Sequence, residues 1–474
     1  MGTLPVVSKT VGPRARRWDV IVLGSGIAGL VAATRLGMAG QRVLIVEEAA
    51  AHDAFPGLRE PFFHAGLRKS GVLDEVLREL GVPLIERRRL EPTARAFQVV
   101  APNMRMDLGT PNLTQDEIEH WGLANPAETQ PLLQALERAA EAERKAMLES
   151  PLVYTGRRSR LRSPTVDAFG RGLPPQIHNA PPRLARLFET IIETLSNRAS
   201  TPPSSEARAR LLGSLLSGGV ELKHGPPWLH GLLRRRVEAH FGEFRTTDER
   251  FQLVSAGGHP GLSIGKGREL WLGRALVVAA SGAALSTALE QEPIPSFLAE
   301  KRPTRRRITL HWKAPKDSIP AGMGQNLILV GDSHPLLDLE EPETNAPETG
   351  PAVTLSIFGS DGNTGDCHLV GASVSKDGEK IEAVEARIEK RVRLLFPFEN
   401  GSMTRSSSRR PRWDDDNWLE DPPRKLGWPT QVPLRVSSRP PVYRLDRSEI
   451  GGLGLEGDLL LGWRGGDAIA SELS

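Results

Sequence analysis

Cysteine is almost absent from this sequence, which has one, Cys367, among 474 residues. A single thiol cannot form an intramolecular disulfide, and it cannot build a cysteine-based zinc or iron–sulfur site. The sequence also lacks zinc-ligand spacing, a P-loop lysine motif and a serine-hydrolase motif, so we expect no metal centre. A chain without disulfides suits a reducing compartment, and we expect it in the cytoplasm.

Long apolar runs are missing as well. None approaches the roughly 18–20 residues that a transmembrane helix needs, so we expect no membrane-spanning segment, while a peripheral membrane contact stays open. Aromatic residues make up only 5% of the chain, which predicts an aliphatic core. The net charge of +3 is close to balance. We interpret short basic clusters, such as Arg234–Arg236 and Arg305–Arg307, as solvated surface and expect no nucleic-acid partner.

The N-terminal region carries the clearest motif. Asp19–Leu23 is a short strand whose residues Val20 to Leu23 are continuously apolar, as expected for a parallel strand buried on both faces. A glycine-rich turn and an apolar helix follow, then a second strand over residues 41–46 with acidic residues at its end. This order of strand, turn, helix, strand and acid predicts a dinucleotide-binding unit. Its candidate cofactor-binding residues are Gly24, Ser25, Gly26, Ile27, Ala28, Gly29, Glu47 and Glu48.

Each part of this motif has a mechanical reason. Gly24 permits the tight turn, Gly26 lets a pyrophosphate approach the backbone, and Gly29 lets the helix pack close to the sheet. The helix N-terminus offers N–H groups and partial positive charge to the phosphates. Glu47 stands near the expected distance of roughly 20 residues, where its carboxylate accepts hydrogen bonds from ribose hydroxyls and repels a 2′-phosphate. Glu48 should point to the other side of the strand end.

Hydrophobic periodicity predicts the remaining elements. We expect helices over residues 62–80, 126–147, 181–197, 228–241 and 378–396. We expect strands over 244–250, 251–255, 261–265, 269–272, 275–280, 308–312, 326–330, 353–358 and 368–374. A last buried strand is predicted over Gly457–Leu461, followed by a glycine-rich turn and the start of a short helix at the chain end.

Three blocks together resemble the superfamily of FAD-dependent amine oxidases, protoporphyrinogen oxidases and phytoene desaturases. They are Asp19–Glu48, Gly225–Leu285 and Gly457–Ala468. The resemblance implies an α/β fold: a Rossmann-like FAD-binding domain of the GR2 type, with a parallel sheet and a β-meander, and a discontinuous α+β substrate domain. It implies that residues 1–110, 225–300 and 445–474 form the FAD-binding domain, and that residues 111–224 and 301–444 form the substrate domain.

The resemblance also implies the cofactor, FAD, and further contacts to it. The backbone near Phe251 would contact adenine, and Ser281 and Gly282 would lie at the end of the last strand of the meander. Gly466 and Asp467 would begin a helix facing the flavin. Arg59 is the candidate for the arginine that neutralises the pyrophosphate, although it comes later than the family's usual position.

Three functions fit these observations. The first is an FAD-dependent oxidoreductase that takes hydride from a small apolar or amine-bearing substrate; no catalytic side chain is assigned, and the oligomeric state is left open. The second is a non-catalytic FAD-binding or scaffold protein, favoured by the shortened C-terminal segment and the displaced arginine. The third is a dehydrogenase that uses NAD alone. The absorption spectrum of the purified protein separates them.

Overall fold

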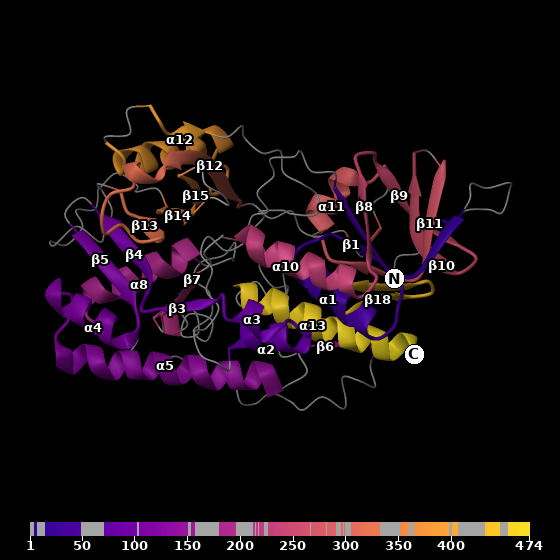
Figure 1. The fold of residues 1–474 in the computed structure, drawn as a ribbon, viewed down its shortest axis with the longest axis horizontal. Coiled ribbons are helices and arrows are strands. Elements are labelled where there is room, and N and C mark those ends of the chain that lie inside the picture. Colours follow the sequence, from indigo (N-terminus) through magenta and orange to yellow (C-terminus); the bar gives the residue numbers. More distant parts are fainter. Residues whose placement is uncertain are drawn as a thin grey trace.

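The chain forms two lobes, each built on a large β-sheet (Figure 1). In this computed structural model the following residues are described: 4–6, 15–48, 71–101, 104–149, 153–156, 180–195, 212–213, 215–216, 218–221, 226–265, 267–280, 282–290, 295–296, 298, 305–331, 351–359, 365–397, 401–405, 432–445 and 454–474. Arg59 and Ser281 lie outside these residues, as do residues 62–70 of the helix expected over 62–80.

The first lobe contains an eight-stranded sheet. Its parallel centre has the order β19-β11-β1-β2-β8, while β18 pairs antiparallel with β19 at the edge, and β9 and β10 continue from β11 as an antiparallel meander. The strands are β1 (Ala15–Leu23), β2 (Val43–Glu48), β8 (Glu243–Thr247), β9 (Phe251–Ala256), β10 (His259–Ile264), β11 (Glu269–Val278), β18 (Arg435–Ser438) and β19 (Pro441–Arg444).

Both faces of this sheet are covered, which explains the apolar run Val20–Leu23 at the end of β1. Val20 and Val22 join the core on the side of the helices, whereas Ile21 and Leu23 join a second core with the meander. Successive side chains of a strand point to opposite faces, so a strand buried on both must be apolar throughout. The helices of this lobe are α1 (Ile27–Met38), α2 (Val72–Glu79), α3 (Leu84–Arg87), α10 (Pro226–Ala239), α11 (Gly282–Ala288) and α13 (Gly454–Leu473).

The second lobe contains a seven-stranded sheet with the order β16-β12-β15-β14-β13-β4-β5. All its pairings are antiparallel except that of β13 with β4. Helices α4, α5 and α8 belong to this lobe, and α12 covers the face formed by β12, β14 and β15 (Figure 1). The elements are β4 (Arg95–Ala101), β5 (Met104–Gly109), α4 (Pro111–His120), α5 (Pro126–Glu149), α8 (Pro182–Leu195), β12 (Arg307–Pro315), β13 (Asn326–Leu329), β14 (Val353–Gly359), β15 (Asp366–Val374), α12 (Ile381–Leu394) and β16 (Thr404–Arg405).

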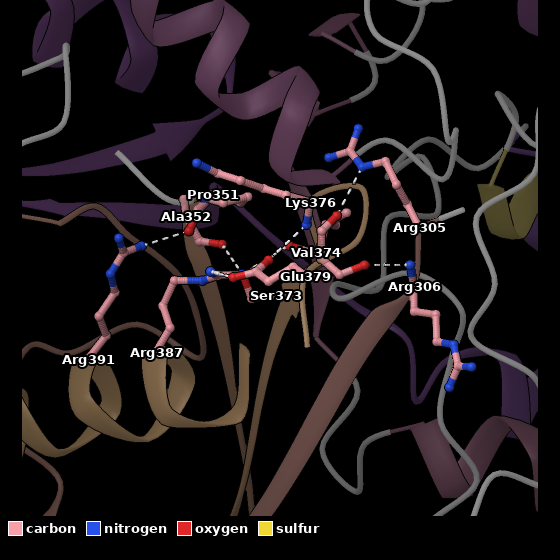
Figure 2. Close-up of polar contacts among 11 residues, drawn as sticks. Arg305, Arg306, Pro351, Ala352, Ser373, Val374, Lys376, Glu379, Arg387 and Arg391 are labelled. Carbon is pink, nitrogen blue, oxygen red and sulfur yellow. Dashed lines mark hydrogen bonds and ion pairs between the residues drawn. The ribbon is translucent and has the colours of Figure 1, made fainter. Parts of the chain in front are cut away.

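Two arginines of α12 donate hydrogen bonds to backbone carbonyls at the ends of β14 and β15 (Figure 2). Arg391 donates to the carbonyl of Pro351 at 2.9 Å, and Arg387 donates to the carbonyl of Val374 at 3.1 Å. Arg387 also pairs with Glu379, whose carboxylate accepts the backbone N–H of Lys376 at 2.8 Å. The polar edge of α12 is thus tied to the sheet, while Val384, Ile388 and Val392 fill the core.

Two minor sheets complete the described chain. One pairs β3 (Glu91–Thr93) with β7 (Gly219–Glu221), and the other pairs β6 (Val153–Tyr154) with β17 (Val432–Pro433). Among the described residues, no helix is long and apolar enough to cross a membrane.

The C-terminal segment differs from the expectation. Residues 457–461 form no strand but lie inside α13, a helix of 20 residues. The strand that returns to the parallel sheet near the chain end is instead β19, which pairs with β11. The short apolar run Leu459–Leu461 fits a buried helix as well as a strand, and here packing against α1 decides for the helix.

Sheet membership also departs from the expected partition at two places. Strands β4 and β5, within residues 95–109, belong to the seven-stranded sheet, whereas β18 and β19, within residues 435–444, belong to the eight-stranded sheet. We therefore propose that the substrate lobe begins near residue 95 and that the other lobe resumes near residue 432.

Candidate functional site

The turn between β1 and α1, together with the start of α1, carries Gly24, Gly26 and Gly29, which we call the fingerprint. Its geometry is the one that a dinucleotide-binding motif requires. Gly24 adopts φ +105°, which L side chains rarely adopt. Its N–H donates to the carbonyl of Val46 at 2.9 Å, so the turn is fixed to the neighbouring strand β2. A Cβ on Gly24 would lie 3.1 Å from the backbone nitrogen of Ala280 at the end of β11. The turn therefore sits tightly where three parallel strands end.

Gly29 has the packing role expected of the third glycine. A Cβ there would lie 2.4 Å from the carbonyl oxygen of Gly24, closer than any real contact. Gly26 is the N-cap of α1, and its carbonyl accepts the first helical hydrogen bond, from Leu30 at 2.9 Å. The next N–H groups, from Ile27 to Gly29, belong to the first turn, which has no acceptors within the helix. N–H groups of this kind can bind an anion, and here they follow directly after β1 and its turn.

Glu47 at the end of β2 is held by a partner that sequence reasoning missed. Only 7% of the residue is exposed. Arg234 of α10 donates from Nη1 to Oε2 at 2.7 Å and to Oε1 at 2.9 Å. The guanidinium also lies 3.8 Å from the ring centroid of Phe244 in β8. Arg234 was expected on a solvated surface; the buried carboxylate accounts for its different position.

Two more arginines of the basic clusters, which were expected on a solvated surface, also have partners in the fold. Arg236 donates to the carbonyl of Leu80 at 3.0 Å. Arg307 is 3% exposed and donates to the carbonyl of Thr194 at 3.0 Å. These arginines satisfy carbonyls at the ends of elements, so they serve the fold rather than forming a solvated face.

Helix α10 also contacts the fingerprint turn. Nε2 of His230 lies 2.9 Å from the carbonyl oxygen of Ser25. Because a carbonyl only accepts, Nε2 is the protonated ring nitrogen in this contact. Ser25 itself is buried at 5% exposure. One helix thus supports both the turn and the acid of the motif.

The other residues assigned to the cofactor from the sequence lie in three places. Glu48 is half-buried at the end of β2, opposite Thr247 of β8. Gly282 begins α11, directly after the end of β11. Phe251 is fully buried in the meander, and its carbonyl accepts a hydrogen bond from Glu290 at 2.9 Å. Its assigned contact with adenine, and the roles of Arg59 and Ser281, stay predictions.

Gly466 and Asp467 do not begin a helix, which corrects their expected role. Both lie within α13, and Asp467 pairs with Nε of Arg35 in α1 at 2.6 Å. A Cβ on Gly466 would lie 2.7 Å from Cβ of Arg35. A Cβ on Gly462 would lie 2.6 Å from the carbonyl of Ala28. These glycines let α13 approach α1 closely, behind the turn that carries the fingerprint.

Arg464 of α13 contacts the end of α5 in the second lobe. It donates to the carbonyl of Leu148 at 2.6 Å, and its guanidinium lies 3.9 Å from the ring centroid of Trp463. Burial lowers the pKa of Arg464 from its ordinary value. This side chain therefore connects α13 to the end of α5.

The donor set at the ends of β1 and β2 fits FAD. The turn offers backbone N–H groups to a pyrophosphate, and the positions of Gly24 and Gly29 have no room for a side chain. Glu47 offers carboxylate oxygens to a ribose. No cluster of His, Cys, Asp or Glu that could hold a metal occurs within the described ranges.

Comparisons with known proteins agree with this geometry. Residues 19–55 match the family described as FAD binding domain, which confirms FAD as the cofactor of the N-terminal fingerprint. No curated protein matches the sequence.

Solved structures extend the likeness to the whole chain. An oxidoreductase from Methanosarcina mazei is similar with a TM-score of 0.55 and 13% identity, over 93% of this chain and 98% of that one. Cyclohexylamine oxidase from Brevibacterium oxydans gives a TM-score of 0.50 and 15% identity over 96% and 99%. Putrescine oxidase bound to putrescine gives 0.51 and 13% over 96% and 100%. These structures share the two-lobed α/β fold that was expected.

Proposed function

We propose that this protein is an FAD-dependent oxidoreductase that takes hydride from a small apolar or amine-bearing substrate. One arrangement carries the proposal. The glycine turn between β1 and α1 and the acid Glu47, which Arg234 holds, lie at the ends of neighbouring strands in a two-lobed α/β fold. Bound FAD supplies the redox chemistry. The chain contributes binding and orientation: α1 presents N–H groups to the phosphates, and Glu47 accepts hydrogen bonds from the ribose.

One feature supports a substrate site in the second lobe, and another suggests the class of substrate. Its seven-stranded sheet is separate from the nucleotide-type sheet and has its own cores. Cyclohexylamine oxidase and putrescine oxidase, which share the fold, act on amines as their names state. An amine substrate is therefore the first class to test, and the small size of both named amines favours small compounds.

The alternative of a non-catalytic FAD-binding protein loses one of its reasons. It was favoured by a C-terminal helix thought to be short, whereas α13 has 20 residues. Arg59, the second reason, lies outside the described residues. Within the part of the chain that the structure describes, no observation favours NAD alone.

An anaerobic substrate screen tests the proposal. The FAD-loaded protein is mixed with primary amines, cyclic amines, polyenes and porphyrinogens, and the flavin absorbance is followed. We expect bleaching with one or more small amines and recovery of the colour on admitting air. Bleaching by polyenes or porphyrinogens alone would overturn the amine assignment, and no bleaching by any compound would favour the non-catalytic alternative.

A further inference from the structure

Helix α10 reaches both halves of the dinucleotide motif from one face. His230 and Arg234 lie four residues apart on it, and side chains at this spacing lie next to each other on a helix. His230 contacts the carbonyl of Ser25, and Arg234 contacts the carboxylate of Glu47. The chain separates Arg234 from Glu47 by 187 positions, so the sequence gives no local sign of this pairing.

The pair of Arg234 and Glu47 is closely defined. The Glu47 side chain is 9% exposed and that of Arg234 is 30% exposed. One nitrogen, Nη1, lies 2.7 and 2.9 Å from the two carboxylate oxygens. Stacking on Phe244 restrains the plane of the guanidinium from a second side. The carboxylate is therefore fixed in rotation as well as in position.

This arrangement leaves hydrogen-bonding capacity on Glu47. An ionised carboxylate has about four lone-pair sites, and Nη1 approaches along the direction that both oxygens share. The carboxylate can therefore accept further hydrogen bonds beside those from Arg234. A ribose offers two hydroxyl groups on neighbouring carbons, which matches two oxygens of one carboxylate.

We propose that Arg234 is a positioning residue for the adenosine part of the cofactor: it fixes Glu47 so that both oxygens accept hydrogen bonds from the ribose hydroxyls. This inference rests on the proposed FAD binding. Arg234 touches neither the flavin nor a substrate, so its effect is on cofactor affinity and on recognition of the ribose. Without it, Glu47 remains buried but is free to rotate away from the hydroxyl groups.

Binding measurements with two ligands test this role. Dissociation constants are measured for FAD and for its 2′-deoxyadenosine analogue, with the wild type, R234M, E47Q and the double variant. Because a hydrogen bond to a charged group is at stake, we expect R234M to weaken FAD binding about tenfold. The 2′-deoxy analogue keeps only the 3′-hydroxyl, so its affinity should fall by a clearly smaller factor. The loss in the double variant should fall short of the product of the two single losses.

The exposed neighbour Arg235 supplies the control, and R235M should bind both ligands as the wild type does. If R234M weakened FAD and the analogue equally, Arg234 would only stabilise the fold, and the proposal would be wrong. Unchanged affinity for FAD would overturn it as well. A folded wild type that binds no FAD would overturn the proposed function, and this inference with it; melting temperatures of all variants identify any that fail to fold.

Discussion

At the residue scale, the fingerprint depends on two glycines for different reasons. Gly24 needs its backbone conformation, with φ +105°, whereas Gly29 needs the absence of a side chain. Both requirements were predictable from the sequence because the spacing of the motif fixes which glycine turns and which one packs. The partner of Glu47 was not predictable, since Arg234 comes from a distant helix and stands in a cluster that reads as surface charge.

G29A tests the close approach of α1 to the turn. Its Cβ would meet the backbone of Gly24 at 2.4 Å, so the turn or the helix must shift. We expect a loss of about 1–3 kcal/mol in the free energy of unfolding, as overpacking usually costs, and a clear loss of FAD. Thermal melting and flavin content after gel filtration measure the two effects.

G231A is the matched control, because Gly231 is also inside a helix. A Cβ there would meet only the end of Arg235 at 3.5 Å. We expect this variant to gain about 0.5–1 kcal/mol, since alanine favours a helix over glycine. Equal behaviour of the two variants would contradict the packing role of Gly29.

E47A and E48A separate the two acids at the end of β2. Loss of a hydrogen bond to a charged group costs about 1.5–3 kcal/mol, so E47A should weaken FAD binding roughly ten- to hundredfold. E48A should have a much smaller effect, because Glu48 points to the other side of the strand. Isothermal titration with FAD makes the comparison. Equal losses, or a larger loss for E48A, would mean that the ribose acid is misassigned.

At the element scale, α13 shows why local sequence was not enough. Residues 459–461 are three leucines in a row without clear periodicity, and the glycines at 462, 465 and 466 resemble a turn. In the structure, Gly462 and Gly466 stand one turn apart and face Ala28 and Ala32 of α1. Their use is a close helix crossing, which the neighbouring helix determines and the segment itself does not reveal.

G462A and G465A test this crossing. The Cβ of G462A would lie 2.6 Å from the backbone carbonyl of Ala28, whereas that of G465A would meet the end of the Leu445 side chain, which can move. We expect G462A to lower the stability by about 1–3 kcal/mol and G465A to have a clearly smaller effect. Melting temperatures compare the two, and a larger loss for G465A would refute the crossing.

The hydrogen bonds of Glu379 with Arg387 and Lys376, near the start of α12, predict that the free energy of unfolding depends on pH. Burial raises the pKa of Glu379, but the hydrogen bonds from Arg387 and from the backbone of Lys376 outweigh it, and the pKa lies below its ordinary value of 4.5. The ionised carboxylate therefore stabilises the fold above about pH 4.5, and this contribution is lost as the pH falls through the lower folded-state value.

E379Q removes this contribution. We expect the variant to be less stable than the wild type by about 1–3 kcal/mol at neutral pH, as for a hydrogen bond to a charged group. The difference should shrink below pH 4. Urea denaturation at several pH values measures it, and a difference that stays constant into the acid range would show that charge is not the cause.

At the scale of the whole molecule, the sequence predicted the layers of the fold better than it predicted which residues belong to which lobe. The parallel centre and the meander followed from apolar strands around glycine-rich turns, and both appear in the structure. The assignment of residues 95–109 to the first lobe did not anticipate that β4 pairs in parallel with β13, a strand more than two hundred residues later. Such long-range pairing leaves no signal in a local pattern.

The architecture connects these scales to function. Helices α13 and α10 both pack against α1, the helix that follows the glycine turn (Figure 1). Side chains of α10 also contact the turn, through His230, and the acid Glu47, through Arg234. The cofactor site is therefore supported by helices from the start, the middle and the end of the chain. Such a preorganised site lowers the cost of ordering groups when the cofactor binds.

The visible spectrum of the purified wild-type protein, taken after incubation with FAD and gel filtration, tests the central claim most directly. The account predicts one FAD for each folded chain, with bands that bleach with dithionite under anaerobic conditions and return in air. A folded protein that elutes colourless, and that NAD rather than FAD protects against heat, would contradict it.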